Sequence, residues 1–256
     1  MSIPLVDLTL FWSAGRGDNF TTATAEGRDS ALAAGYVQVR REAEVFPAEL
    51  DGFVDPHQRK EFEELVARTV PLTLFWSETR QDNFVSGSAE GRASALEAGY
   101  RVVRDEGRVL EAWPTDGSAY YRLRTLWHAG RGDNFLTAQW MADHDARAEG
   151  YLSVRNEGFA PSSLPLKTTW ATAGDPSQGR FDVTGQGFTP SGRIHVYTFA
   201  TDRDFDQAVT NYGETTATAA GDFSMVVGGK YGVQETAGHL IAVDLSSGSE
   251  TVVREL

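Results

Sequence analysis

The stretch LFWSAGRGDNF, Leu10 to Phe20, decides the fold, because the chain contains it three times. It returns as LFWSETRQDNF from Leu74 to Phe84 and as TLWHAGRGDNF from Thr125 to Phe135. The sequence that follows each copy is also repeated, up to a shared Ala-Gly-Tyr or Glu-Gly-Tyr and a shared Arg-x-Glu. A unit of about 40 residues that occurs three times indicates a repeat architecture, in which neighbouring units bury their apolar faces against one another.

The first half of each repeat predicts a β-hairpin. In copy one, alternation over residues 8–12 is typical of a strand with one buried face. Residues 14–19 are rich in Gly and Asn and predict the turn. Residues 20–24 are aromatic or β-branched and predict the returning strand.

The second half of each repeat predicts a short helix and two more strands. Thr24 is the expected N-cap, and Gly35 the expected glycine after the helix. Residues 36–40 alternate again, and after a turn near Glu42 the segment 45–46 predicts a fourth strand. Each unit is therefore expected to be β-β-α-β-β.

The repeats form one predicted domain, residues 1–164, with copies at 8–46, 72–110 and 123–160. Between the first two copies, the amphipathic segment 55–68 predicts an inserted helix with Asp55 as N-cap. Its apolar side is expected to carry Phe62, Leu65 and Val66. The second spacer predicts a plain hairpin through residues 114–117.

Three similar units of short strands favour closure around a pseudo-threefold axis. A β-trefoil satisfies this, and closure removes exposed sheet edges. The alternative is an open array in which each unit contacts only its neighbours. The fold class is thus mainly β: a three-repeat, β-trefoil-like head with short helices.

A second domain is expected over residues 165–256, after a Pro- and Ser-rich linker at 161–165. Here the helical signals stop, and about seven short alternating runs are punctuated by Gly. This pattern is typical of a small immunoglobulin-like β-sandwich.

The overall composition indicates which classes of binding partner are disfavoured. The chain has 256 residues, a formal net charge of −13 and no cysteine. Its acidity disfavours nucleic acid and anionic lipid, which need clustered Lys and Arg. No apolar run is long enough for membrane insertion. The N-terminal residues do not encode a signal peptide, which leaves a cytoplasmic location or extracellular or surface export by another route.

The best candidate ligand site is the tip of each hairpin with its neighbouring tryptophan. An aromatic ring can stack on a sugar, while carboxylate, amide and guanidinium groups can bind its hydroxyls. Three copies would add avidity to weak single sites. The candidate ligand-binding residues are Trp12, Arg16, Asp18, Asn19, Trp76, Arg80, Asp82, Asn83, Trp127, Arg131, Asp133 and Asn134.

These residues also have a purely structural interpretation. Asp-Asn at a turn can hydrogen-bond to its own backbone, and the tryptophans alternate in phase with core residues. The recurrent Arg-x-Glu, at Arg40–Glu42, Arg104–Glu106 and Arg155–Glu157, favours an ion pair over a ligand contact.

Metal and catalytic motifs are not found. The five histidines have no metal-ligand spacing, and His144 is expected on a solvated face. No nucleophile elbow, P-loop or dinucleotide motif occurs, so no catalytic residue is predicted. The acidic run Asp202 to Asp206 favours a solvated loop, with a calcium loop as the alternative. No other cofactor is predicted.

The repeats resemble an uncharacterised domain of secreted bacterial and fungal proteins, whose motif contains Gly-Asp-His-Phe-Tyr-Thr-Thr and a later Ala-Gly-Tyr. The matching pieces are Gly17 to Thr22, Ala34 to Tyr36 and Glu106-Gly107. The family's His is replaced by Asn19, Asn83 and Asn134, and its Tyr by Thr21, Val85 and Leu136. Residues 183–190 and 219–224 resemble bacterial immunoglobulin-like modules. The resemblance implies a role in attachment more than in catalysis.

Together these observations predict a non-catalytic, lectin-like protein that binds a carbohydrate or cell-surface receptor at up to three equivalent sites. The alternatives are a structural, assembly or adhesion module that binds another protein, and the receptor-binding part of a toxin or effector.

Overall fold

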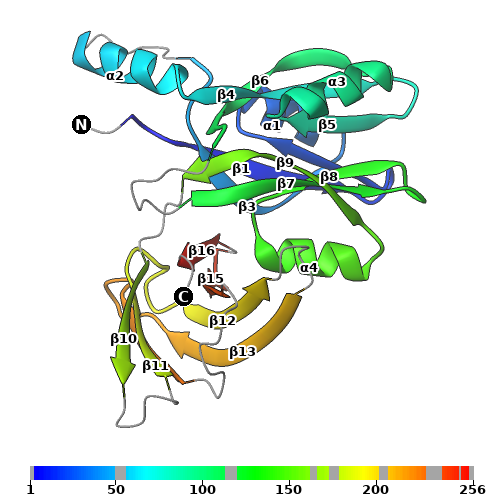
Figure 1. The fold of residues 1–256 in the computed structure, drawn as a ribbon. Helices are drawn as coiled ribbons and strands as arrows, with labels where there is room; N and C mark the ends of the chain where they lie inside the picture. Colours follow the sequence, from blue (N-terminus) through cyan, green and yellow to red (C-terminus); the bar gives the residue numbers. More distant parts are fainter. Residues whose placement is uncertain are drawn as a thin grey trace. The chain divides into compact units, whose positions relative to one another are not determined.

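The computed structural model describes residues 3–49, 56–112, 120–161, 166–172, 179–201, 207–228, 238–247 and 249–253. The fold is mainly β, with several antiparallel sheets (Figure 1). The chain divides into two compact units, Met1–Pro161 and Ser162–Leu256, here called the repeat unit and the C-terminal unit. Several expected features lie outside the described residues: the linker 162–165, the turn 114–117, Asp55 and the acidic run Asp202 to Asp206.

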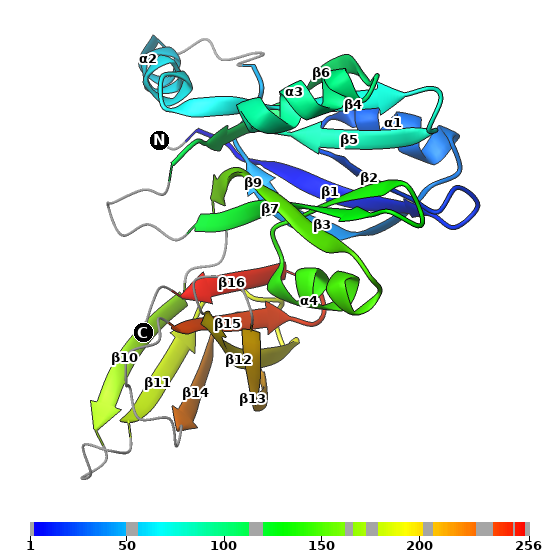
Figure 2. The same ribbon diagram turned by 45° about the vertical axis from the view of Figure 1, so that its right-hand side comes forward.

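The three repeats have the same element order, with one inserted helix. The first comprises β1 (Val6–Ser13), β2 (Asp18–Thr22), α1 (Ala25–Ala33) and β3 (Val37–Val45). After the inserted helix α2 (Pro56–Val66), the second comprises β4 (Thr69–Ser77), β5 (Asp82–Ser86), α3 (Ala89–Glu97) and β6 (Arg101–Leu110). The third comprises β7 (Tyr120–His128), β8 (Asp133–Thr137), α4 (Trp140–Ala148) and β9 (Leu152–Pro161). Each helix contacts the second strand of its own repeat, as Figure 2 shows clearly for α3.

The predicted third and fourth strands of a repeat are one long strand, which corrects the expected β-β-α-β-β order to β-β-α-β. In β3, Leu8 pairs with Ala43 and Thr9 with Arg41, so Glu42 is an extra residue in a bulge. A bulge bends a strand without detaching it from its partner. The predicted turn near Glu42 is therefore wrong. Glu106 and Glu157 occupy the same bulge in β6 and β9.

The first strand of each repeat is buried on both faces, whereas one buried face was expected. In the second repeat, Phe75 packs with Phe84, Ala95 of α3 and Tyr100 on the helix side of the sheet. In the first repeat, Leu10 packs into a cluster of the third repeat that includes Leu126. One face thus meets the repeat's own helix, and the other meets the neighbouring repeat.

The helix ends follow the predicted capping. The Thr24 hydroxyl accepts a hydrogen bond from the Gly27 N–H at 3.1 Å, and Ser88 does the same for Gly91 at 3.0 Å. Gly35 has a positive φ of 82°, which glycine adopts without steric cost. The helix of the third repeat, α4, begins after Gln139, whose side chain makes no capping hydrogen bond.

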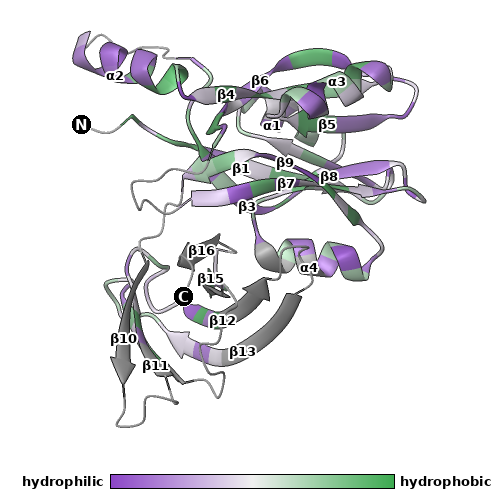
Figure 3. Cartoon of the chain, in the orientation of Figure 1, coloured by the Kyte–Doolittle hydropathy of each residue, from purple (hydrophilic) through white to green (hydrophobic). Residues whose placement is uncertain are grey.

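The three repeats close on one another at both ends of their strands. β2, β5 and β8 contact one another in all three pairings, as do β3, β6 and β9. Backbone bridges link Phe46 to Arg108 and Leu110 to Phe159. The inserted helix α2 caps an apolar cluster at this end through buried Phe62 and Leu65. Val66, expected on the same side, is exposed; Figure 3 shows α2 as largely hydrophilic apart from its C-terminal part.

The C-terminal unit contains seven strands among its described residues. They are β10 (Leu166–Thr172), β11 (Gly179–Gly185), β12 (Arg193–Thr201), β13 (Gln207–Thr216), β14 (Phe223–Gly228), β15 (Gly238–Asp244) and β16 (Ser249–Val253). They form one sheet of order β10-β11-β14 and another of order β13-β12-β15-β16. Residues of both sheets share one core, including Val183, Ile194 and Phe223. Among the described helices of the whole chain, none is long and apolar enough to span a membrane.

Candidate functional site

The three aspartates expected at separate hairpin tips meet at a single place. Asp18, Asp82 and Asp133 begin β2, β5 and β8, so they belong to the strands and not to the turns. One carboxylate oxygen of each lies within 4.8 Å of the other two. The residues are only 3%, 2% and 2% exposed. They form what we call the aspartate ring, which is shielded from any ligand at the surface of a single hairpin.

Each aspartate is held by its own repeat and by the next one. Tyr36, Tyr100 and Tyr151 donate their hydroxyl hydrogen bonds to Asp18, Asp82 and Asp133 in turn. The side-chain amide of Asn83 donates to Asp18 Oδ2 at 3.1 Å, and that of Asn134 to Asp82 Oδ2 at 2.9 Å.

The same contact joins the first and last repeats. The Asn19 amide donates to Asp133 Oδ2 at 2.7 Å, and the Asn19 backbone N–H donates to Asp133 Oδ1 at 3.0 Å. Every repeat therefore gives its asparagine to the preceding repeat's aspartate, in a closed cycle. The predicted Asx interactions with local backbone are replaced by contacts between repeats.

The tyrosines of the ring were not among the predicted site residues. Each follows the glycine that ends its helix, and the positive φ of that glycine turns the chain back towards the sheet. Each ring then packs edge-to-face on the phenylalanine after the Asp-Asn pair, as Tyr36 does on Phe20. The signal was present, since Tyr36, Tyr100 and Tyr151 recur in phase with the aspartates.

Burial dominates the electrostatics of the ring. It raises the pKa of Asp18 to about 7, with a further contribution from the adjacent Asp82 carboxyl. Burial also raises the pKa of Asp133 to about 7, against the opposing effect of the hydrogen bonds from Tyr151 and Asn19. The pKa of Asp82 is raised for the same principal reason. Burial also raises the pKa of the tyrosines above its usual range, so they remain hydrogen-bond donors.

An exposed arginine covers each tyrosine. The guanidinium carbons of Arg16, Arg80 and Arg131 lie 5.5, 5.7 and 5.6 Å from the ring centroids of their own repeats' tyrosines. This distance is within the range of a cation–π contact. We call these three residues the arginine rim. Of the predicted ligand residues, these are the ones that are exposed in every repeat.

The predicted tryptophans are less exposed than the rim arginines. Trp12, Trp76 and Trp127 are half-buried, so part of each indole remains accessible. Trp76 Nε1 is 3.4 Å from Glu78 Oε2. In the third repeat, Arg131 also donates to Glu149 at 3.0 Å.

The recurrent Arg-x-Glu forms the predicted ion pair in each repeat. The nitrogen–oxygen distances are 2.8 Å for Arg40–Glu42, 2.8 Å for Arg104–Glu106 and 3.7 Å for Arg155–Glu157. The glutamates are buried because their bulges direct them towards the preceding repeat.

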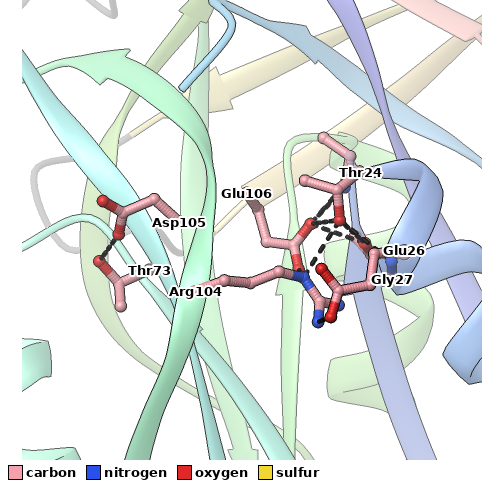
Figure 4. A network of polar contacts seen from close by, with 9 residues as sticks. Thr24, Glu26, Gly27, Thr73, Arg104, Asp105 and Glu106 are labelled. Atoms are coloured by element: carbon pink, nitrogen blue, oxygen red, sulfur yellow. Dashed lines mark hydrogen bonds and ion pairs between the residues drawn. The ribbon is translucent and has the colours of Figure 1, made fainter. Parts of the chain in front are cut away.

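These glutamates, here called the glutamate clamps, fix the start of the neighbouring helix. Glu106 Oε2 accepts hydrogen bonds from the Thr22 hydroxyl and the Ala23 N–H, and from both the N–H and hydroxyl of Thr24 (Figure 4). Glu157 makes the equivalent contacts with Ser86, Gly87 and Ser88. Glu42 has a simpler environment, with one hydrogen bond from the Thr137 hydroxyl at 2.7 Å.

Histidine contributes to the third repeat alone. His128 packs against Tyr151, with ring centroids 5.0 Å apart, and its Nδ1 accepts a hydrogen bond from the Arg131 N–H. The side chain of His144, expected on a solvated face, lies outside the described residues.

The comparisons with known proteins do not assign the chain to a family. No model of a known protein family matches it, and no curated protein is significantly similar to it.

Proposed function

We propose that the repeat unit is a non-catalytic binding module that recognises a carbohydrate or cell-surface glycan through the arginine rim. The supporting observation is that the same exposed guanidinium is held over a tyrosine three times. A fixed guanidinium can donate paired hydrogen bonds to sugar hydroxyls or to the carboxylate of an acidic sugar. The half-buried tryptophans offer an apolar face for the sugar ring.

This proposal changes the role of the predicted polar residues. The aspartates and asparagines hold the tyrosines, and the tyrosines in turn position the arginines. The proposed ligand contacts are made by the arginine rim, together with Trp12, Trp76 and Trp127, at up to three equivalent sites.

We also propose a finer assignment for the fold of each unit. Closed contacts among all three repeats support a trefoil-like head, although each unit has three strands where four were expected. Two antiparallel sheets around one core support an immunoglobulin-like C-terminal unit. Kinship with the uncharacterised Gly-Asp-His-Phe-Tyr-Thr repeat domain is supported by the recurring motif alone.

A glycan array tests the proposed function. The intact protein is compared with a variant carrying R16Q, R80Q and R131Q together, and with R59Q, which removes an exposed arginine from α2. We expect bound glycans to be lost with the triple variant and retained with R59Q. A blank array from folded, monodisperse wild-type protein, or binding unchanged in the folded triple variant, would contradict the proposal.

A second candidate function, docking of another protein, is favoured by exposed apolar side chains. They recur where the third strand of each repeat begins: Val37 is 61% exposed, Val102 58% and Leu152 68%. β3 ends the sheet β2-β1-β3, whereas β6 and β9 adjoin each other in the six-stranded sheet β5-β4-β6-β9-β7-β8. β6 and β9 pair only at Leu110 and Phe159, at the opposite end of each strand from Val102 and Leu152, so among the described residues the edges near the exposed side chains are unpaired. A V37D, V102D and L152D variant should lose a protein partner or self-association without losing glycan binding. Sedimentation velocity and the same array separate the two functions.

A further inference from the structure

The aspartate ring has oxygen atoms whose hydrogen-bonding capacity is not used. The tyrosine and asparagine donors all bind Oδ2 of their aspartate. Oδ1 of Asp18 and Oδ1 of Asp82 are fully buried and accept no hydrogen bond from a described donor, although the two carboxyls lie beside each other. A buried carboxylate oxygen without a donor is costly, so these atoms require an explanation.

The charge of the ring is also uncompensated by the described residues. Apart from the contact between the Asp18 and Asp82 carboxyls, the groups that contact the three carboxylates are tyrosine hydroxyls, asparagine amides and one backbone N–H, all of them neutral. The ion pairs among the described residues involve other carboxylates, such as Glu42, Glu106 and Asp143, and none of the three. The rim arginines stand over the tyrosine rings. Three carboxylates this close together must be neutralised by protons or by a bound cation.

We propose that Asp18, Asp82 and Asp133 together bind one hard divalent cation of the calcium type, on the axis that relates the three repeats. Carboxylate oxygens are the ligands that such cations prefer. Calcium–oxygen distances are about 2.3–2.6 Å, so three oxygens spaced evenly around one calcium ion lie about 4.0–4.5 Å apart. The three carboxylate oxygens lie within 4.8 Å of one another, so an inward shift of at most about 0.5 Å by each would bring all three within reach of a single ion.

The surroundings of the ring suit such a site. A small cavity of about 10 Å³ is lined in part by Asn19, Asn83 and Asn134, whose side chains bond to the ring, and by none of the three aspartates. That volume is near the minimum for one water molecule. The same asparagines and the tyrosines fix the carboxylate orientations, as outer hydrogen bonds do at metal sites. The site would be shared equally among the repeats, with one ion per chain.

Sensitised terbium luminescence tests the proposal, because Tb³⁺ commonly replaces calcium and a tyrosine hydroxyl contacts each ligand residue. Chelator-treated intact protein is titrated with Tb³⁺ at physiological salt, with excitation of the tyrosines, and Ca²⁺ is then added as competitor. We expect saturable emission with one ion per chain, displaced by Ca²⁺. In D82N the affinity should fall at least about tenfold, since even outer-sphere changes cost that much.

The control variant is D105N, which removes an exposed carboxylate from the same unit. It should bind Tb³⁺ like the wild type, because its side chain bonds to Thr73 outside the ring. Equal emission in wild type and folded D82N would show binding to surface carboxylates and overturn the proposal. So would a wild-type protein without saturable emission whose stability responds to pH but not to millimolar Ca²⁺, because protons alone would then neutralise the ring. The wild-type titration is decisive even if D82N does not fold. Glycan binding can fail or succeed independently of either result.

Discussion

Replacing Glu106 by Gln should destabilise the repeat unit far more than replacing Glu42, although both occupy the same buried bulge. Glu106 accepts four hydrogen bonds from the first repeat, and Glu42 accepts one from the third. A hydrogen bond to a charged group contributes about 1 kcal/mol more than one to a neutral group. The amide also presents a donor to the arginine that the carboxylate had paired with.

The expected losses in the free energy of unfolding are about 4–5 kcal/mol for E106Q and about 1–2 kcal/mol for E42Q. The difference, about 3 kcal/mol, corresponds to roughly 6–12 °C in Tm for a domain of this size. Differential scanning calorimetry of the intact chain measures it. E157Q should behave like E106Q, because Glu157 also holds a helix start.

Equal shifts for E42Q and E106Q would refute this reasoning. The number of hydrogen bonds from the neighbouring repeat would then not set the stability, and the shared ion pair with arginine would account for the whole effect. A larger loss for E42Q would contradict it more strongly.

Three further predictions follow from other contacts. G158A should lower the Tm by at least several degrees, because a Cβ there would lie 2.9 Å from the Leu110 carbonyl at a φ of +123°; G15A, with open space around it, should change the Tm little. D244A should cost the C-terminal unit about 3 kcal/mol, because the carboxylate accepts backbone N–H bonds from the Thr189 loop and from its own turn. Burial alone would raise the pKa of Asp244, but the backbone hydrogen bonds outweigh burial and lower it. In urea titrations, the stabilisation from Asp244 should therefore be lost as the pH falls through that lowered pKa. The D244A variant should not show this pH-dependent loss. With chelator present, the Tm of the repeat unit should fall as the pH rises from about 4 towards 8. The pKa values of the ring aspartates are higher in the folded state, so their protonation stabilises that state. Added Ca²⁺ should reverse the loss.

The sequence predicted the repeat elements well, because their signals are local. The hairpins, the caps at Thr24 and Ser88 and the glycine at Gly35 depend on residues within a few positions of one another. The Arg–Glu ion pairs were predicted for a similar reason, since both members lie on one strand.

The candidate site could not be predicted to the same extent, because its contacts cross between repeats. The pairing of Asn19 with Asp133 spans 114 residues and depends on closure of the ring. The bulges could not be predicted either, because the sequence around Glu42 resembles a turn. Only the pairing of β1 with β3 shows that Glu42 is an extra residue in a strand. The polar residues therefore appeared to be three surface sites, whereas three of them share one buried site.

The most direct test of that shared site is the number of calcium ions bound per chain, counted by native mass spectrometry of the intact protein. One ion in the wild type, and none in a folded variant carrying D18N, D82N and D133N, is the predicted result. Three ions per chain would indicate separate sites in the repeats, and none in the wild type would show that the aspartate ring is not a cation site.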